Sequence, residues 1–237
     1  MTVALGRPTP LLAQAADAWF DGIPDPVEQA LTVLRWAGDT FGDEFAITSS
    51  MADGLLSHLA STAIPGVHVI FLDTGYHFPE TIGTRDWITS VLPITLVNVQ
   101  PERTVAEQDL ELGPRLYERD PDLCCSLRKV QPLAQSLAGY LAWGSGVRRD
   151  ESPTRADTRI VDWDAKREMI KINPLAAWTQ DDVDRYTAEH GIPVNPLFEI
   201  GYGSIGCAPC TRPVAPGEDP RAGRWAGRGK TECGIHS

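Results

Sequence analysis

Apolar residues recur at helical spacing through the first forty positions of the chain. Their pattern predicts one helix from Pro10 to Phe20 and a second from Pro26 to Thr40. Asp25 is a favourable N-cap for the second helix, and a proline at the first helical position suits the turn that follows. We expect residues 1–40 to form a segment of packing helices that carries no chemistry.

From Glu44 onward, short apolar runs alternate with helical patterns. Runs at residues 45–48, 67–72 and 94–99 predict strands, and the helices between them predict a parallel sheet with right-handed crossovers. Ligands of such sheets bind at the carboxyl ends of the strands. Ser49 and Ser50 follow the first strand, and a strand, a small polar loop and a helix form the layout in which backbone N–H groups bind phosphate. Leu72 ends the second strand at the same edge.

The second half of the α/β pattern is less regular. We expect a helix and a loop over 103–123, a strand over 140–143, a hairpin over 159–172, and a helix that begins after Thr179 and ends at Gly191. Trp87, Trp143 and Trp163 are expected in the core. We predict three parts of the chain. N-terminal helices occupy residues 1–40, an α/β nucleotide-binding domain occupies 41–206, and a C-terminal segment that carries three of the cysteines occupies 207–237.

The charge is distributed unevenly along the chain. Residues 1–120 carry 6 basic and 17 acidic side chains, whereas residues 121–237 carry 15 of each, and the net charge is -11. An acidic chain argues against long nucleic acids as partners, because those are bound through many lysine and arginine contacts to phosphates. A small anion needs only a few focused cations, which the second half supplies.

Several of these cations lie in one loop and are candidates for anion binding. Arg148, Arg149 and Arg155 lie in the loop that follows the strand at 140–143, and arginine binds anions with two parallel hydrogen bonds. The alternative is a solvated loop in which these arginines pair with Asp150 and Glu151. The residues leave both interpretations open.

Four of the five cysteines form two close pairs, Cys124-Cys125 and Cys207-x-x-Cys210. Two separated pairs of thiolates suit a four-cysteine zinc or iron–sulfur site. A disulfide between adjacent residues is strained, and zinc sites usually have gaps of two to four residues in both halves. The spacing therefore favours an iron–sulfur cluster, with zinc as the alternative.

The fifth cysteine, Cys233, lies in a glycine-rich tail at residues 227–237 that has no apolar periodicity. Two interpretations stand: a frayed end with an incidental thiol, or a mobile tail that delivers the thiol to a site. The N-terminal sequence lacks the layout of a secretion signal, and no apolar run approaches the roughly 20 residues that span a bilayer. We therefore expect a cytoplasmic protein with no membrane partner and reduced thiols.

Over residues 40–237 the chain resembles the assimilatory adenylyl-sulfate reductases, part of the wider phosphoadenylyl-sulfate reductase group. The matching motifs are Phe71-Leu-Asp-Thr-Gly75, Phe78-Pro-Glu-Thr81, Cys124-Cys125 with Arg128-Lys129, Arg148-Arg-Asp-Glu-Ser152, Gly206-Cys-x-x-Cys-Thr-Arg-Pro213, Gly223-Arg-Trp225 and Lys230-Thr-Glu-Cys-Gly-Ile-His236. The last of these is the most specific.

The resemblance implies an adenine nucleotide alpha-hydrolase-like fold. It also implies thioredoxin-dependent reduction of 5'-adenylyl sulfate to sulfite and AMP, in sulfate assimilation and cysteine biosynthesis, through an S-sulfo-cysteine. Cys233 is then the nucleophile. The resemblance also implies nucleotide contacts at Ser49, Ser50 and Leu72 and sulfate contacts at Lys129, Arg221 and Arg224. It implies that Cys124, Cys125, Cys207 and Cys210 are the ligands of a [4Fe-4S] cluster. His236, close to Cys233 in the sequence, is a further candidate substrate contact that would lower the pKa of the thiol.

Two rival functions share parts of this pattern. A tRNA sulfur-transfer enzyme of the same fold needs a glycine-rich ATP loop, but the corresponding segment is Ser49-Ser-Met-Ala-Asp-Gly54. It also needs a basic surface, which the acidic composition disfavours. A non-enzymatic zinc module would use the four cysteines only as a brace. Reduction of the 3'-phosphorylated substrate is a third alternative, and the oligomeric state is left open.

Overall fold

The computed structural model describes residues 7–230 and 232–235. A six-stranded sheet in the order β3-β2-β1-β4-β6-β5 forms its centre, and all neighbours pair in parallel except β5 with β6. The strands are β1 Phe45–Thr48, β2 His68–Leu72, β3 Thr95–Val99, β4 Ala142–Gly144, β5 Val161–Asp164 and β6 Met169–Ile172. The α-helices are α1 Pro10–Phe20, α2 Pro26–Phe41, α3 Leu55–Ala63, α4 Pro79–Val91, α5 Val105–Leu112, α6 Leu116–Arg119, α7 Pro121–Cys125, α8 Gln131–Leu137 and α9 Gln180–His190.

The strand order reverses beside β1. The chain runs outward from β1 through β2 to β3 and then places β4 on the other side of β1. The connections that leave neighbouring strands at such a reversal diverge, so a crevice opens outside the carboxyl ends of the strands. The loops that follow β1 and β4 therefore lie on either side of this crevice.

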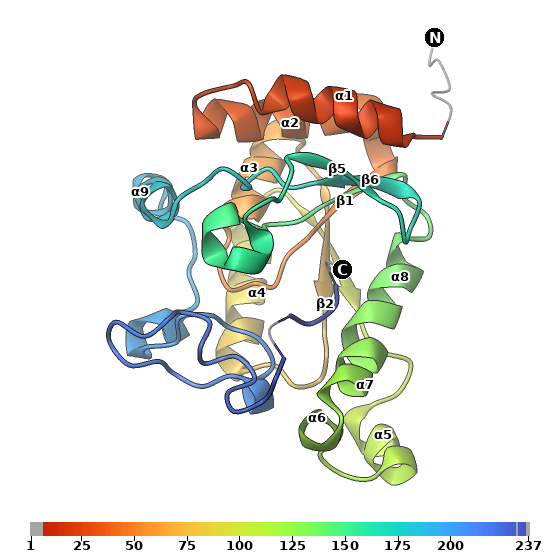
Figure 1. The fold of residues 1–237 in the computed structure, drawn as a ribbon, viewed down its shortest axis with the longest axis vertical. Helices are drawn as coiled ribbons and strands as arrows, with labels where there is room; N and C mark the ends of the chain where they lie inside the picture. The colour runs from red at the N-terminus through yellow and green to blue at the C-terminus, as the bar shows by residue number, and fades with distance from the viewer. Residues whose placement is uncertain (1–6, 231, 236–237) are drawn as a thin grey trace.

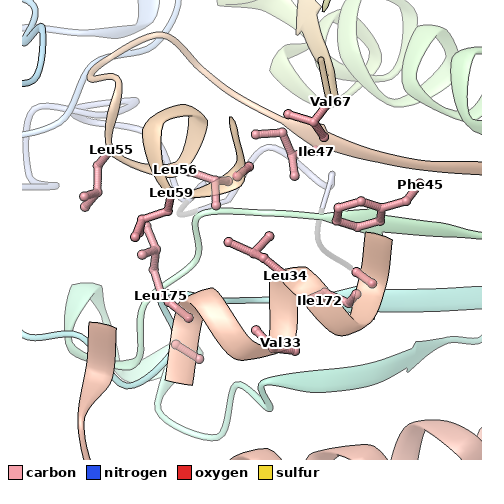
Figure 2. Close-up of a cluster of buried hydrophobic side chains, with 14 of the residues drawn as sticks. Val33, Leu34, Phe45, Ile47, Leu55, Leu56, Leu59, Val67, Ile172 and Leu175 are labelled. Atoms are coloured by element: carbon pink, nitrogen blue, oxygen red, sulfur yellow. The ribbon is translucent and has the colours of Figure 1, made fainter. Parts of the chain in front are cut away.

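The sheet has an apolar layer on each face because successive residues of a strand point to opposite faces. Phe45 and Ile47 of β1 join the larger buried cluster with Leu34 of α2 and Leu59 of α3 (Figure 2). Ala46, between them, joins the smaller cluster. In Figure 1, α1 and α2 cross the upper part of the molecule, and α5 to α8 form a column along its right side. Helices α1 and α2 thus contribute to the same core as the sheet.

The smaller cluster holds the C-terminal segment. It consists of buried side chains from α8 and the sheet, among them Leu133, Trp143 and Met169, and the partly buried Ile235 packs against them. Figure 1 shows the last described part of the chain returning to the middle of the molecule. The tail that bears Cys233 is therefore laid across the sheet in this structure.

Most of the predicted elements are confirmed. The structure has helices at both N-terminal positions, strands within residues 45–48, 67–72 and 94–99, and an antiparallel hairpin within 159–172. Asp25 and Thr179 are N-caps, accepting hydrogen bonds from Glu28 N and Asp182 N. The fold is thus an α/β fold with a mostly parallel sheet, as predicted.

Two predictions about local structure need correction. The segment 103–123 forms parts of three short helices, α5, α6 and α7, instead of one helix and a loop. Trp87 was expected in the core but is 52% exposed, because it lies on the outer face of α4. Trp143 is fully buried as expected. Among the described residues, no helix is long and apolar enough to cross a membrane.

Candidate active site at the strand reversal

A cavity of about 890 Å³ opens at the carboxyl ends of β1, β2 and β4. It brings together residues that are far apart in the sequence. The predicted site residues in its wall are Ser49, Ser50, Leu72, Lys129, Arg148, Arg149, Arg155, Arg221, Arg224 and Cys233. His236 lies outside the described residues. The cavity is large enough for a nucleotide, since ligand pockets typically measure about 300–1,000 Å³.

The loop after β1 turns tightly at the mouth of this cavity. Ser49 N donates to Ile70 O of the neighbouring strand, and the Ser49 hydroxyl accepts from Met51 N at 3.1 Å. Met51 adopts a positive φ of 56°, which an L-residue adopts only where the surroundings enforce it. The loop leads into the N-terminus of α3, where Asp53 Oδ1 accepts from Leu55 N at 2.9 Å.

Each of the three loop arginines forms ion pairs with acidic side chains. Arg148 pairs with Asp150 and Glu151, Arg149 pairs with Asp21 at 3.0 Å, and Arg155 pairs with Glu151. The expected pairing with Asp150 and Glu151 is therefore present for Arg148 and Arg155 but not for Arg149. The loop is not a solvated one, because the side chains of Arg148 and Arg155 are only 13% exposed. The same arginines also line the cavity, so their pairing does not remove them from the site.

All four paired cysteines line a second, smaller cavity. Cys124 and Cys125 end α7, while Cys207 and Cys210 come from a loop more than eighty residues later, and Arg128 completes this part of the wall. The 3₁₀ turn Ala208–Cys210 is anchored where Ala208 N donates to Tyr76 O at 2.7 Å. The two predicted pairs are therefore brought to one place.

Three of the thiols in this cavity, those of Cys124, Cys125 and Cys210, resist ionisation. Burial, reinforced by the neighbouring cysteines, raises the pKa of Cys124 to about 12, and burial raises that of Cys125 to about 11. Burial and Cys207 also raise the pKa of Cys210. A metal bound by thiolates offsets this cost, because binding displaces the protons. The donor set fits a group held by four cysteines.

Four cysteines are the donor set of both zinc sites and iron–sulfur clusters. Within residues 7–230 and 232–235, no three His, Cys, Asp or Glu side chains are grouped so that they can hold one metal ion. The chemistry of the four side chains therefore fits either kind of group.

Lys129 contributes to the walls of both cavities. It lies in a π-helical turn, Ser126–Val130, that joins α7 to α8. Burial alone would lower its pKa, but the thiol groups of Cys207 and Cys233 raise it above the usual value. The lysine is therefore a cation held between the four-cysteine group and the tail cysteine.

A second cation, Arg224, has the same two thiol neighbours. Its pKa is lowered by burial, and the Cys207 and Cys233 thiols oppose that shift. Its guanidinium lies 4.5 Å from the ring centroid of Trp225 and donates to Ile205 O at 3.2 Å. Arg224 thus lines both cavities.

The interpretation of the sequence missed several residues of the site. Arg128 is 4% exposed, donates to Thr74 O and Gln108 Oε1, and lies over the ring of Tyr76. His77 also lines the large cavity and bonds Leu72 O at 2.8 Å. Arg128 directly precedes Lys129, and Thr74 lies two residues after Leu72, within motifs that the sequence analysis recognised. Their positions in these motifs could have identified them as site residues. Nothing in the sequence pointed to Tyr76.

The chain matches the phosphoadenosine phosphosulfate reductase domain over residues 45–213. It is 63% identical to the adenosine 5'-phosphosulfate reductase of Streptomyces coelicolor, over 87% of this chain and 88% of the relative. Identity to the enzyme of the same name from Rhodococcus erythropolis is 47% over the full length of both chains. A crystal structure of phosphoadenylyl-sulfate reductase from Candida auris superimposes with a TM-score of 0.71 at 27% identity, covering 90% of this chain and all of that one. The chain therefore belongs to the phosphoadenosine phosphosulfate reductase family, a family of oxidoreductases.

Proposed function

We propose that this protein reduces 5'-adenylyl sulfate to sulfite and AMP in assimilatory sulfate reduction, which leads to cysteine biosynthesis. The observation that carries the proposal is the position of Cys233, in the wall of the large cavity with Lys129, Arg221 and Arg224. The relatives that share the name adenosine 5'-phosphosulfate reductase at high identity support the choice of substrate.

Cations next to the thiol serve the first chemical step. A thiol with a pKa of about 8.5 is mostly protonated near neutral pH, and nearby positive charge favours the thiolate. The Cys233 thiolate attacks the sulfate sulfur, an S–S bond forms, and the S–O bond to AMP breaks with its electron pair on the AMP oxygen. Lys129, Arg221 and Arg224 offset the repulsion between the thiolate and the anionic substrate.

The second step needs two electrons from a dithiol such as thioredoxin. One donor thiolate attacks Cys233 Sγ, and sulfite leaves with the electron pair of the S–S bond. The second donor thiol then displaces Cys233 from the mixed disulfide, so the donor ends as a disulfide and Cys233 as a thiolate. The tail must leave the cavity for this exchange, and the positive φ values of Gly227 and Gly234, 77° and 79°, mark it as a segment that relies on glycine freedom.

Cys124, Cys125, Cys207 and Cys210 would hold a [4Fe-4S] cluster in the smaller cavity. When bound, this cluster supplies a local charge and hydrogen-bonded sulfurs that tune the electrostatic field at Lys129. The dithiol already accounts for both electrons, so the residues of this chain orient and activate Cys233 without an electron from the cluster. Reduced thiols and a thioredoxin partner fit a cytoplasmic location, with no nucleic acid or membrane partner.

The decisive experiment is mass spectrometry of the protein after incubation with adenylyl sulfate and no dithiol. We expect an adduct of about 80 Da, one sulfonate group, on the peptide that contains Cys233. The Cys233→Ser variant should bind AMP normally and form no adduct. An adduct on another residue, or a protein trimmed just before Thr231 that still releases sulfite, would refute the proposal. A higher kcat/KM for the 3'-phosphorylated nucleotide would assign the other substrate.

A further inference from the structure

We propose that Glu232 is a positioning residue, whose carboxylate is held by Arg155 and Arg221 and thereby fixes the register of the tail, so that the adjacent Cys233 faces Lys129 and Arg224. This inference rests on the proposed function and assigns a role to a residue that chemistry alone does not require. Glutamate neither attacks the substrate nor binds an anion.

The contacts of Glu232 have the geometry of a specific clamp. Arg155 Nε lies 2.9 Å from Oε1 and Arg155 Nη2 lies 2.8 Å from Oε2, which makes two parallel hydrogen bonds. Arg221 Nη2 lies 3.2 Å from the same Oε2. The side chains of the two arginines are only 13% and 17% exposed, so solvent screens these interactions weakly.

The clamp is itself held in place by the loop after β4. Arg155 Nη1 donates to Glu151, and the same Glu151 oxygen accepts from Arg148 N at 3.1 Å. Every guanidinium nitrogen of Arg155 is therefore bonded to a carboxylate. Arg155 is therefore held in one orientation. Because a planar guanidinium binds a carboxylate only within a narrow range of orientations, it defines one position for Glu232.

A second anchor lies just beyond Cys233. Arg167 Nη2 donates to Ile235 O at 3.3 Å, and the Ile235 side chain packs on the apolar cluster that contains Trp143. Arg167 is held by Asp164 at 2.7 Å, and Asp164 also accepts from Trp143 Nε1 at 3.1 Å. The thiol is thus carried by a short span of backbone that is fixed one residue before it and two residues after it.

Fixing this span bears on the rate of the reaction and not on the affinity for nucleotide. A misplacement of about 1 Å can lower a rate by roughly 100-fold, because attack requires the thiolate in line with the sulfate sulfur. Glutamine at position 232 has the size of glutamate but carries no charge, so it cannot form the charge-assisted hydrogen bonds with Arg155 and Arg221. The tail must also detach from the cavity before Cys233 can be reduced. The ion pairs of Glu232 with the two arginines are partly exposed, so they break more readily than the contacts of a buried apolar side chain.

The test compares Glu232→Gln, Arg155→Lys and the double variant with the unaltered protein. Glu111→Gln is the matched control, since it breaks an exposed arginine–glutamate pair with Arg103 that lies outside both cavities. Single-turnover formation of the sulfonate adduct is measured at saturating adenylyl sulfate, and the Kd for AMP is measured by calorimetry. Separately, alkylation of Cys233 by iodoacetamide without nucleotide reports how far the tail is released.

We expect Glu232→Gln to slow adduct formation roughly 10- to 100-fold with an unchanged Kd for AMP, and to accelerate alkylation of Cys233. Arg155→Lys should cost less once Glu232 is replaced than it costs alone, because the two act together. Glu111→Gln should change neither rate. If Glu232→Gln forms adduct and is alkylated at the unaltered rates, the positioning role is wrong; if the two losses are additive, the pairing is wrong. A protein that forms no adduct in its unaltered form, yet shows the alkylation difference, refutes the proposed function and leaves the clamp intact.

Discussion

The Thr74 hydroxyl lies 3.4 Å from the Cys207 sulfur, although 133 residues separate the two in the chain. Thr74 is completely buried in the turn after β2, and its hydroxyl also accepts from Tyr76 N at 3.2 Å. This turn also anchors the segment that follows Cys207, through the Tyr76 carbonyl. The carboxyl end of β2 therefore lines the large cavity and also leads into the turn that contacts one of the proposed cluster ligands.

Replacing Thr74 with valine keeps the shape of the side chain and removes its hydroxyl. We expect the iron-loaded protein to release iron faster and to have a lower cluster reduction potential, because hydrogen bonds to cluster sulfurs stabilise the reduced form. The free energy of unfolding should fall by about 1–3 kcal/mol, since Tyr76 N loses its partner. Iron-release kinetics and voltammetry measure the first two effects. Thr74→Ser, which keeps the hydroxyl, should retain the potential.

Gly206 offers a way to move Arg224 without changing its charge. A Cβ at position 206 would lie 2.2 Å from Arg224 Nη2, so an alanine there has to displace the guanidinium. We expect Gly206→Ala to reduce kcat/KM for adenylyl sulfate by roughly 10- to 100-fold, with a folded protein. Gly139→Ala is the control, because nothing lies within 4 Å of its Cβ position. Equal kinetics of the two variants would remove Arg224 from the sulfate contacts.

Much of the fold follows from the sequence because its strands alternate with amphipathic helices. Ala46 and Ile47 face opposite layers, as the period of two requires, and the predicted limits of β1 match those observed. The polar loop after β1 and the end of β2 were correctly assigned to one edge, because parallel strands align their carboxyl ends. The spacing of the cysteines and the cationic loop supplied further candidates, and the likeness of the short motifs to a known family assigned roles to Lys129, Arg221, Arg224 and Cys233.

The site also contains relations that no local pattern encodes. The Glu232 and Arg155 contact depends on how the tail returns over the sheet, and 77 residues separate the two positions. The exposed position of Trp87 was missed because hydrophobicity alone does not show which side of α4 meets the sheet. The pattern of the segment 103–123 predicted one helix and a loop. Gly113 and Pro114 instead end α5 and separate it from α6.

Lys129 provides a test of the coupling between the two cavities. We expect Lys129→Met to lower the rate of adduct formation by roughly 100- to 1,000-fold, because the cation between Cys207 and Cys233 is removed from a site shielded from water. Lys129→Arg keeps the charge and should recover part of the rate. Single-turnover mass spectrometry measures both variants. A Lys129→Met protein with an unaltered rate would show that Arg221 and Arg224 suffice.

The packing of α3 against α9 predicts how stability depends on pH. His58 Nδ1 lies 3.2 Å from the Tyr186 hydroxyl, and its ring centroid lies 5.1 Å from that of His190. Burial, together with the His190 charge, lowers the pKa of His58 below its usual value. The unfolded chain therefore binds a proton at His58 at a higher pH than the folded protein does.

The sign of the effect follows from that difference. Above about pH 6.5 His58 is neutral in both states and has no influence, whereas below it the unfolded state gains protons first and the free energy of unfolding falls. We expect the Tm to drop between about pH 7.5 and about pH 5.5, and to drop less in His58→Gln. His77, whose pKa is also lowered by burial, acts in the same direction but is present in both proteins and cancels in the comparison. An equal or larger drop in His58→Gln would show that the charge on His58 is tolerated at this helix contact.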